Sequence, residues 1–496
     1  MNNFKKNVRN ILIITISIKF LGFFYKIILA RSFNINVLSS LNLLAPIINL
    51  SLVLSSMSIP IVVNRTVSES IELKNTNIRN YISSAVKLTL ISSSIIFLFF
   101  FSFSYVISRY IYQDLNMMLP LIIMLPLIFF SNLSGIMKSY LESHDKYTQS
   151  VFSNLLEQII KFSLMILIIY LVRNKTVLLI TSLSSLVLLI CEMSSFTYLL
   201  LNVKKITKLR LVRTEKKDLT NILKPSILLT LFSLALTLSS FIEPIIYFSL
   251  SSHINTDQNL TKLVYTSLHS FIFPFIQIGS FLIYIIVKIY FSKIAREQNV
   301  KTINKYLHQA IYLLMFVELI MLNLSKNHSS YLFNLLYGKN TGSYILSSIS
   351  IINFIIFSSP IFTMTLEAKK CENILLTSCV ISCILGLITL TILALIPSVS
   401  IYSIVIGIIV QELSFFIINF ILSIKKGYFK ISYIELFLIV LNLLISSYVS
   451  TLIKSNFEIL DILLETSIIL LIYYPSYIYL RNRFNWYDFF TITWTI

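Results

Sequence analysis

The sequence predicts an all-α, polytopic membrane protein of about fourteen transmembrane helices, arranged as two six-helix lobes and two further C-terminal helices. Two observations support this fold class. Of the 496 residues, 56% are apolar and only 12% are charged, whereas roughly a quarter are charged in soluble domains. The apolar residues also form runs of about twenty, the length that crosses a bilayer as a helix. Because lipid cannot hydrogen-bond to the backbone, we expect each run to be helical.

The apolar runs follow one another along the whole chain. They begin near residues 11, 37, 81, 117, 150, 176, 222, 263, 306, 343, 374, 399, 431 and 461. Lys5, Lys6 and Arg9 precede the first run, which is longer than the apolar part of a signal peptide and lacks a small-residue cleavage site. We therefore expect an uncleaved first helix.

The basic residues between the runs predict the orientation in the membrane. Most of the 40 Lys and Arg residues fall near the two ends of the chain and in the even-numbered loops, which places both termini in the cytoplasm. Their scatter between apolar runs argues against nucleic-acid binding, despite a net charge of +19. Residues 204–224 form the most basic segment and predict an amphipathic linker that lies on anionic membrane lipids.

Internal similarity predicts a duplicated chain. Two groups of residues recur 225 positions later, namely Ile78, Tyr81, Ala85 and Leu88 at Ile303, Tyr306, Ala310 and Leu313, and Leu141-Glu142 at Leu366-Glu367. Six predicted helices separate the copies, so both have the same orientation, as in a parallel repeat. The predicted parts are an N-terminal lobe (1–203), the basic linker (204–224), a C-terminal lobe (225–426) and a last helix pair with a cytoplasmic tail (427–496).

Charged residues inside the predicted helices indicate where a site could lie. An ionisable side chain at a helix centre costs about 2.5–3.5 kcal/mol on insertion scales, so it needs a partner, a cavity or a path to the interface. Lys19 and Lys26 are seven residues apart, hence two turns apart on nearly one face, which favours a cavity for an anionic substrate. Alternatively, Lys26 extends with Arg31 to the outer membrane surface, whereas Lys19 lies too deep to do so.

Acidic residues supply further candidates. Glu157 and Lys161 form an i, i+4 pair, which either neutralises itself or contributes to the cavity. Three other carboxylates are candidates for proton or cation coupling: Glu243, Glu318 and Glu412. Lys87 and Glu192 are interpreted as structural, because they lie nearer the ends of their spans.

No motif indicates catalysis. Cys379 and Cys383 share a helix face but lack a surrounding cluster of metal-ligating residues, and His144 with Asp145 is interpreted as a solvated loop pair. The sequence contains no glycine-rich phosphate loop and no nucleophile elbow. We therefore expect neither an enzyme nor a protein with a bound cofactor or metal.

Four segments resemble the multidrug/oligosaccharidyl-lipid/polysaccharide (MOP) exporter superfamily, in particular its branch of stage V sporulation protein B and the lipid II flippases. These segments are IKFLGFFYKIILARSF (18–33) and residues 41–70, 135–161 and 287–310. Their order and spacing agree with the family over nearly the whole chain. The resemblance implies a transporter of the cytoplasmic membrane that flips an undecaprenyl-pyrophosphate-linked peptidoglycan precursor of the lipid II type.

The resemblance also implies which residues line the substrate cavity. Lys19 and Arg31 occupy positions of family arginines, whereas Tyr25 stands where the next cavity arginine is expected. His269, before Pro274, corresponds loosely to a further arginine. Together with the residues chosen for their charge, the predicted substrate-binding set is Lys19, Lys26, Arg31, Glu157, Lys161, Glu243 and His269.

Other functions fit the same fold. The substrate could be a lipid-linked polysaccharide or a teichoic-type repeat unit, and a cation-coupled multidrug exporter or a scaffold in wall assembly are alternatives of other classes. For the leading hypothesis, the expected partners are a lipid-linked anionic glycan precursor, anionic membrane lipids and enzymes of cell-wall or spore-wall synthesis. A role in spore cortex formation follows from the resemblance alone.

Overall fold

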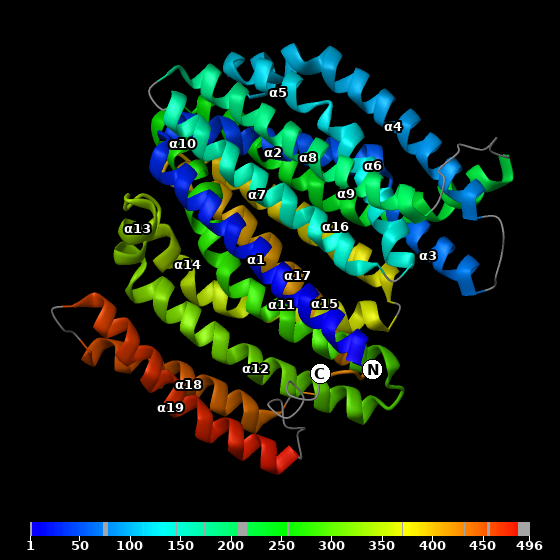
Figure 1. Ribbon diagram of the computed structural model, residues 1–496. Coiled ribbons are helices and arrows are strands. Elements are labelled where there is room, and N and C mark those ends of the chain that lie inside the picture. Colours follow the sequence, from blue (N-terminus) through cyan, green and yellow to red (C-terminus); the bar gives the residue numbers. More distant parts are fainter. Residues whose placement is uncertain are drawn as a thin grey trace. The chain divides into compact units, whose positions relative to one another are not determined.

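The computed structural model is almost entirely helical (Figure 1). It describes residues 2–72, 78–112, 114–144, 146–172, 175–206, 216–254, 257–369, 371–430, 432–453 and 457–484. No strand occurs in these ranges, so the predicted all-α class is confirmed. Much of the predicted basic linker, residues 207–215, lies outside the described residues.

All fourteen predicted spans begin within or beside helices. In the described part of the chain, 12 helical stretches are long and apolar enough to cross a membrane. The two other predicted spans correspond to α11 (Phe273–Arg296) and to α18 (Tyr433–Leu452), whose shorter apolar stretch is Tyr433–Ser446. The chain is therefore a multi-pass membrane protein.

The chain forms two compact units, of which the first covers Met1–Lys262. Its core lies where α3, α4, α6, α8 and α9 meet, and the buried residues there include Val63, Ala85, Leu141 and Leu199. The helices of unit 1 are α1 (Asn2–Ser32), α2 (Ile35–Ser56), α3 (Ile59–Glu72), α4 (Ile78–Val106), η1 (Ile107–Ile111), η2 (Leu115–Met117), α5 (Met118–Met124), α6 (Leu127–Ser143), α7 (Tyr147–Val172), α8 (Val177–Ile206), α9 (Lys216–His253) and the start of α10 (Gln258–Ser267).

One span of unit 1 is broken between α2 and α3. Met57 and Ser58 have φ angles of 47° and 51°, a left-handed conformation that costs non-glycine residues energy. The break frees carbonyl groups at the end of α2, and neighbouring helices bond to the backbone and the side chain of Ser55 there. The Ser92 hydroxyl of α4 donates to the Ser55 carbonyl at 2.5 Å, and the Asn132 amide of α6 donates to the Ser55 hydroxyl at 2.7 Å.

The second unit covers Leu263–Ile496. In it α12 packs against α11, α14, α18 and α19, while α16 and α17 form a close pair. Its helices are the end of α10, η3 (Leu268–Ile272), α11 (Phe273–Arg296), α12 (Val300–Asn327), α13 (Ser329–Tyr337), α14 (Ser343–Ile356), α15 (Ser359–Ala368), α16 (Glu372–Ala394), η4 (Ser400–Tyr402), α17 (Ser403–Lys425), α18 (Tyr433–Leu452) and α19 (Glu458–Phe484).

Glycines permit the close approach of α16 and α17. A Cβ atom added to Gly386 would lie 2.7 Å from the Cβ of Gln411 and 3.0 Å from the carbonyl oxygen of Gly407. We expect Gly386→Ala to lower the free energy of unfolding by about 1–3 kcal/mol through overpacking. Gly22→Ala is the matched control, since the nearest atom, Oε1 of Gln158, would be 3.8 Å away. Thermal unfolding in detergent would contradict the prediction if both variants melted alike.

Polar contacts hold α18 and α19 along α12 (Figure 1). We call these contacts, which lie at three levels along α12, the α12 anchor. At one end, His308 pairs with Glu435 of α18. In the middle, the Asn442 amide of α18 donates to the Tyr312 hydroxyl at 3.1 Å, and the Tyr473 hydroxyl of α19 donates to the Tyr312 carbonyl at 2.7 Å. At the other end, Nε2 of His328 lies 2.9 Å from Oε2 of Glu465, which also accepts from Asn323 at 2.6 Å.

The residues of the proposed repeat have matching local structure. The Leu141 carbonyl accepts from the backbone N–H of Lys146 at 2.9 Å, and the Leu366 carbonyl accepts from that of Cys371 at 2.9 Å. Both leucines are fully buried. The helix ends after Leu141 and Leu366, which are 225 residues apart, therefore form the same backbone hydrogen bond. The boundaries of the two lobes stay a prediction.

Candidate functional site

Four helices of unit 1 bring ionisable side chains together within the predicted membrane spans. The packing of α7 against α1 and α8, and of α6 against α8, places them (Figure 1). We call this group the charged cluster; it consists of Lys26 on α1, Lys138 on α6, Glu157 and Lys161 on α7, and Glu192 on α8. Three lysines face two glutamates, so with all five groups ionised the charged cluster has a positive balance that suits an anion.

Lys161 links the members of the charged cluster. Its Nζ lies 4.6 Å from the centre of the Tyr25 ring, a cation–π contact of about 0.5–2 kcal/mol. It attracts the carboxylates of Glu157 and Glu192 and repels the ammonium of Lys26. Tyr25 therefore supports a neighbouring cation.

Glu192 lies midway along α8, which is longer than a twenty-residue span. The sequence interpretation placed it nearer the end of a twenty-residue span, and α8 continues beyond that end. Ser131 of α6 donates a hydrogen bond to this carboxylate, and Lys138 and Lys161 attract it. Its Oε2 atom is buried and, among the residues that the structure describes, has no hydrogen-bond partner. This oxygen could accept a proton, a water molecule or a polar group of a substrate.

Lys138 was not singled out from the sequence, although it lies in a segment that carries the resemblance. Its Nζ donates to Oδ1 of Asn154 on α7 at 2.6 Å. A lysine near the end of a helix has no local pattern that marks it as part of a site. Only the packing of α6 on α7 and α8 reveals its neighbours.

The remaining residues predicted on α1 lie outside the charged cluster. The side chain of Lys19 is exposed in unit 1, two turns before Lys26, and that of Arg31 is exposed in the last turn of the helix. Lys26 itself is half-buried. The structure thus brings Lys26 together with Glu157 and Lys161, while Lys19 borders this group along the helix.

Glu243 and His269 occupy other helices. Glu243 on α9 accepts a hydrogen bond from the Ser239 hydroxyl at 3.0 Å. His269 belongs to unit 2, within the π-helix η3, and its ring lies between those of Tyr265 and Phe273, at 4.5 and 5.1 Å. These contacts make His269 part of an aromatic cluster with tilted and edge-on rings.

Unit 2 contains further carboxylates in its spans. Glu318 of α12 is 2% exposed and accepts from the Ser358 hydroxyl at 3.1 Å, at the break between α14 and α15. Glu412 on α17 is half-buried, and its carboxylate interacts electrostatically with the thiol of Cys379. In the described ranges, no group of three or more His, Cys, Asp or Glu side chains has the geometry to hold a metal ion.

Comparison with known proteins identifies the fold. No family model and no curated protein sequence matches the chain. Among solved structures, a lipid II flippase MurJ in an inward closed conformation superposes with a TM-score of 0.73, at 17% identity over 95% of this chain and 99% of that one. The chain has the fold of the MOP transporters.

Multidrug transporters share this MOP fold. An inward-facing MATE family transporter of the MOP superfamily matches with a TM-score of 0.70, at 11% identity over 82% of this chain and 94% of its own. The MATE multidrug transporter DinF-BH matches with a TM-score of 0.60, at 12% identity over 86% of this chain and 96% of its own. At such identities the likeness concerns the fold.

Proposed function

We propose that the protein flips an undecaprenyl-pyrophosphate-linked peptidoglycan precursor of the lipid II type across the cytoplasmic membrane, with both termini in the cytoplasm. The charged cluster carries the proposal. A head group with anionic phosphates and sugars cannot cross hydrocarbon, and a group of charged side chains with a positive balance inside the predicted spans would offset that cost. The likeness to MurJ supports the proposal, since it spans 95% of the chain, against 82% and 86% for the two MATE transporters.

In this proposal the two glutamates limit how tightly the charged cluster binds the substrate. A transporter must release its substrate, so the cations cannot bind an anion too tightly. Glu157 and Glu192 both attract the ammonium of Lys161, so they would compete with a phosphate of the substrate for it. Moving one charge across 100 mV changes the free energy by about 2.3 kcal/mol, so the membrane potential would also influence the cycle.

The direct test measures lipid II at the outer leaflet. In cells whose only candidate flippase is this protein, an externally added toxin that degrades lipid II should cleave the precursor, and depletion of the protein should abolish cleavage. Unchanged cleavage after depletion would contradict the proposal. Unchanged cleavage together with loss of a surface polysaccharide would instead indicate a translocase for another lipid-linked glycan.

Cation-coupled multidrug export is the second candidate, favoured by the MATE-like fold and by the buried carboxylate oxygen of Glu192. Such an exporter would remove a fluorescent lipophilic cation from cells in a manner that depends on Glu192. Export of the dye without any effect on lipid II would select this candidate. Lipid II cleavage without dye export would exclude it.

Lys19 tests whether the charged cluster extends along α1. We expect Lys19→Ala to lower the rate of precursor flipping and Lys19→Arg to restore it, because the position requires a cation rather than a particular side chain. Arg31→Ala, at the exposed end of the same helix, is the comparison. Flipping and complementation at the parental level in Lys19→Ala would remove Lys19 from the proposed path.

A further inference from the structure

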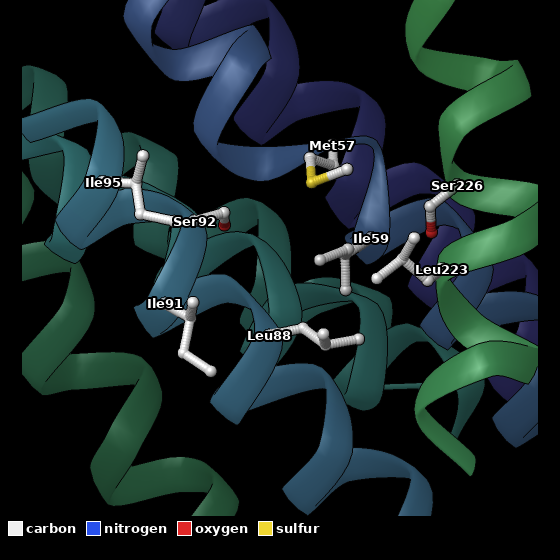
Figure 2. Close-up of a pocket in the computed structure, with 8 residues that line it drawn as sticks. All are labelled: Met57, Ile59, Leu88, Ile91, Ser92, Ile95, Leu223 and Ser226. Carbon is white, nitrogen blue, oxygen red and sulfur yellow. The ribbon is translucent and has the colours of Figure 1, made fainter. Parts of the chain in front are cut away.

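A cavity of about 170 Å³ lies in unit 1 beside the break between α2 and α3. Figure 2 shows Leu88, Ile91 and Ile95 of α4 on one side, and Met57, Ile59 and Leu223 on the other. An apolar cavity of roughly 150 Å³ holds a benzene-sized group in a soluble protein. This cavity is thus large enough for a short stretch of hydrocarbon chain.

The walls of the cavity are chemically apolar although two serines contribute to them. The Ser226 hydroxyl donates to the Ile222 carbonyl at 2.6 Å, and the Ser92 hydroxyl donates to the Ser55 carbonyl at 2.5 Å. Both hydroxyl protons are therefore engaged within the protein. A water molecule needs two to four polar partners, so hydrocarbon is favoured over water here.

The mouth of the cavity opens where lipid is the surrounding medium. Ile91 and Ile95 are 49% and 60% exposed, and both belong to the predicted membrane span Ile78–Ile111. The exposed side chain of Lys87 lies one turn before Ile91, about 6 Å along the helix and toward the end predicted to be cytoplasmic. The ammonium of Lys87 next to the apolar mouth is complementary to a phospholipid, whose anionic phosphate lies next to its acyl chains.

We propose that this cavity binds one acyl chain of a membrane phospholipid, whose phosphate contacts Lys87. The acyl chain packs against Met57, one of the two strained residues, and against Ile59, the residue that follows them. A bound lipid thus fills the space beside the broken span and stabilises its bent conformation. This ligand is separate from the transported substrate, so the inference does not depend on the proposed flipping of lipid II.

Photolabelling in nanodiscs tests the site. The protein is reconstituted with phosphatidylglycerol that carries a diazirine on one acyl chain, irradiated, and mapped by mass spectrometry. We expect several-fold more label at the cavity residues of α4 and at Met57 than at Phe99 and Phe103, exposed residues further along the same span. Equal labelling of both regions in the unaltered protein would overturn the proposal.

Two variants and one control sharpen the test. Ser226→Phe fills the cavity from its buried side and should reduce cavity labelling at least fivefold, while Leu231→Phe, on an exposed face of the same helix, should leave it unchanged. Lys87→Ala, at an exposed position, should reduce it about threefold. If Ser226→Phe does not elute as a monodisperse protein, Lys87→Ala decides alone. Undiminished labelling, or labelling by a photoreactive polyprenyl phosphate but not by the phospholipid, would overturn the assignment.

Discussion

Lys161→Ala is expected to abolish most of the precursor flipping. The substitution removes the ammonium that the Tyr25 ring supports and leaves Glu157 and Glu192 without their shared cation. In the proposed function Lys161 also pairs with a phosphate of the substrate, and loss of one partner from such a desolvated pair costs about 2–5 kcal/mol, which corresponds to a roughly 30-fold or larger loss of binding. The measurement is the rate at which lipid II becomes accessible to the external toxin.

The controls separate charge from folding. Lys161→Arg should keep a substantial part of the rate, because it retains the cation above Tyr25. Lys175→Ala, an exposed lysine just before α8, should behave as the parent. All variants are compared at equal amounts of protein in the membrane. A full rate for Lys161→Ala would show that the charged cluster does not contact the substrate.

Glu465→Ala should cause the largest loss of stability. The glutamate accepts hydrogen bonds from Asn323 and pairs with His328, and the side chains of both His328 and Glu465 are almost fully buried. Removing the carboxylate leaves the buried amide of Asn323 and the buried ring of His328 without their shared acceptor, and each unsatisfied buried polar group costs about 1–3 kcal/mol. Thermal unfolding in detergent should therefore begin at a clearly lower temperature.

Hydrogen exchange measured in individual helices tests whether the α12 anchor accounts for the loss of stability in Glu465→Ala. Hydrogen exchange should increase in α18 and α19 more than in α16, since only the first two helices depend on the anchor. Glu458→Ala, at the exposed start of α19, is the matched control. Adding His328→Ala to Glu465→Ala should cost little more, because the pair is already broken. Parental melting of Glu465→Ala would show that the pair contributes nothing to stability.

Local patterns explain which features could be predicted from the sequence. A twenty-residue apolar run has few alternatives to a helix in lipid, so every predicted span falls on helical structure. The association of Glu157 with Lys161 followed from their i, i+4 spacing. The break at Met57 and Ser58 was not predicted, because neither residue is a glycine and the stabilising groups, Ser92 and Asn132, belong to other helices.

Contacts between distant segments could not be predicted in this way. Glu192 and Lys138 join the charged cluster only because α6, α7 and α8 pack together. The pairs of the α12 anchor join residues 127 and 137 positions apart, and nothing in the spacing of a histidine and a glutamate over such a distance indicates contact. The sequence therefore indicated which residues of one helix lie together, but not which residues of different helices do.

The α12 anchor has a consequence for biogenesis. Because the chain is synthesised from its N-terminus, α12 enters the bilayer before α18 and α19 exist. During that interval His308, Tyr312 and Asn323 face lipid or another protein without their eventual partners, which is costly at membrane depth. We therefore expect α12 to stay beside the insertion machinery until Glu435 and Glu465, which lie 127 and 137 positions after their histidine partners, have been added. A chain truncated before α18 should remain there and be degraded.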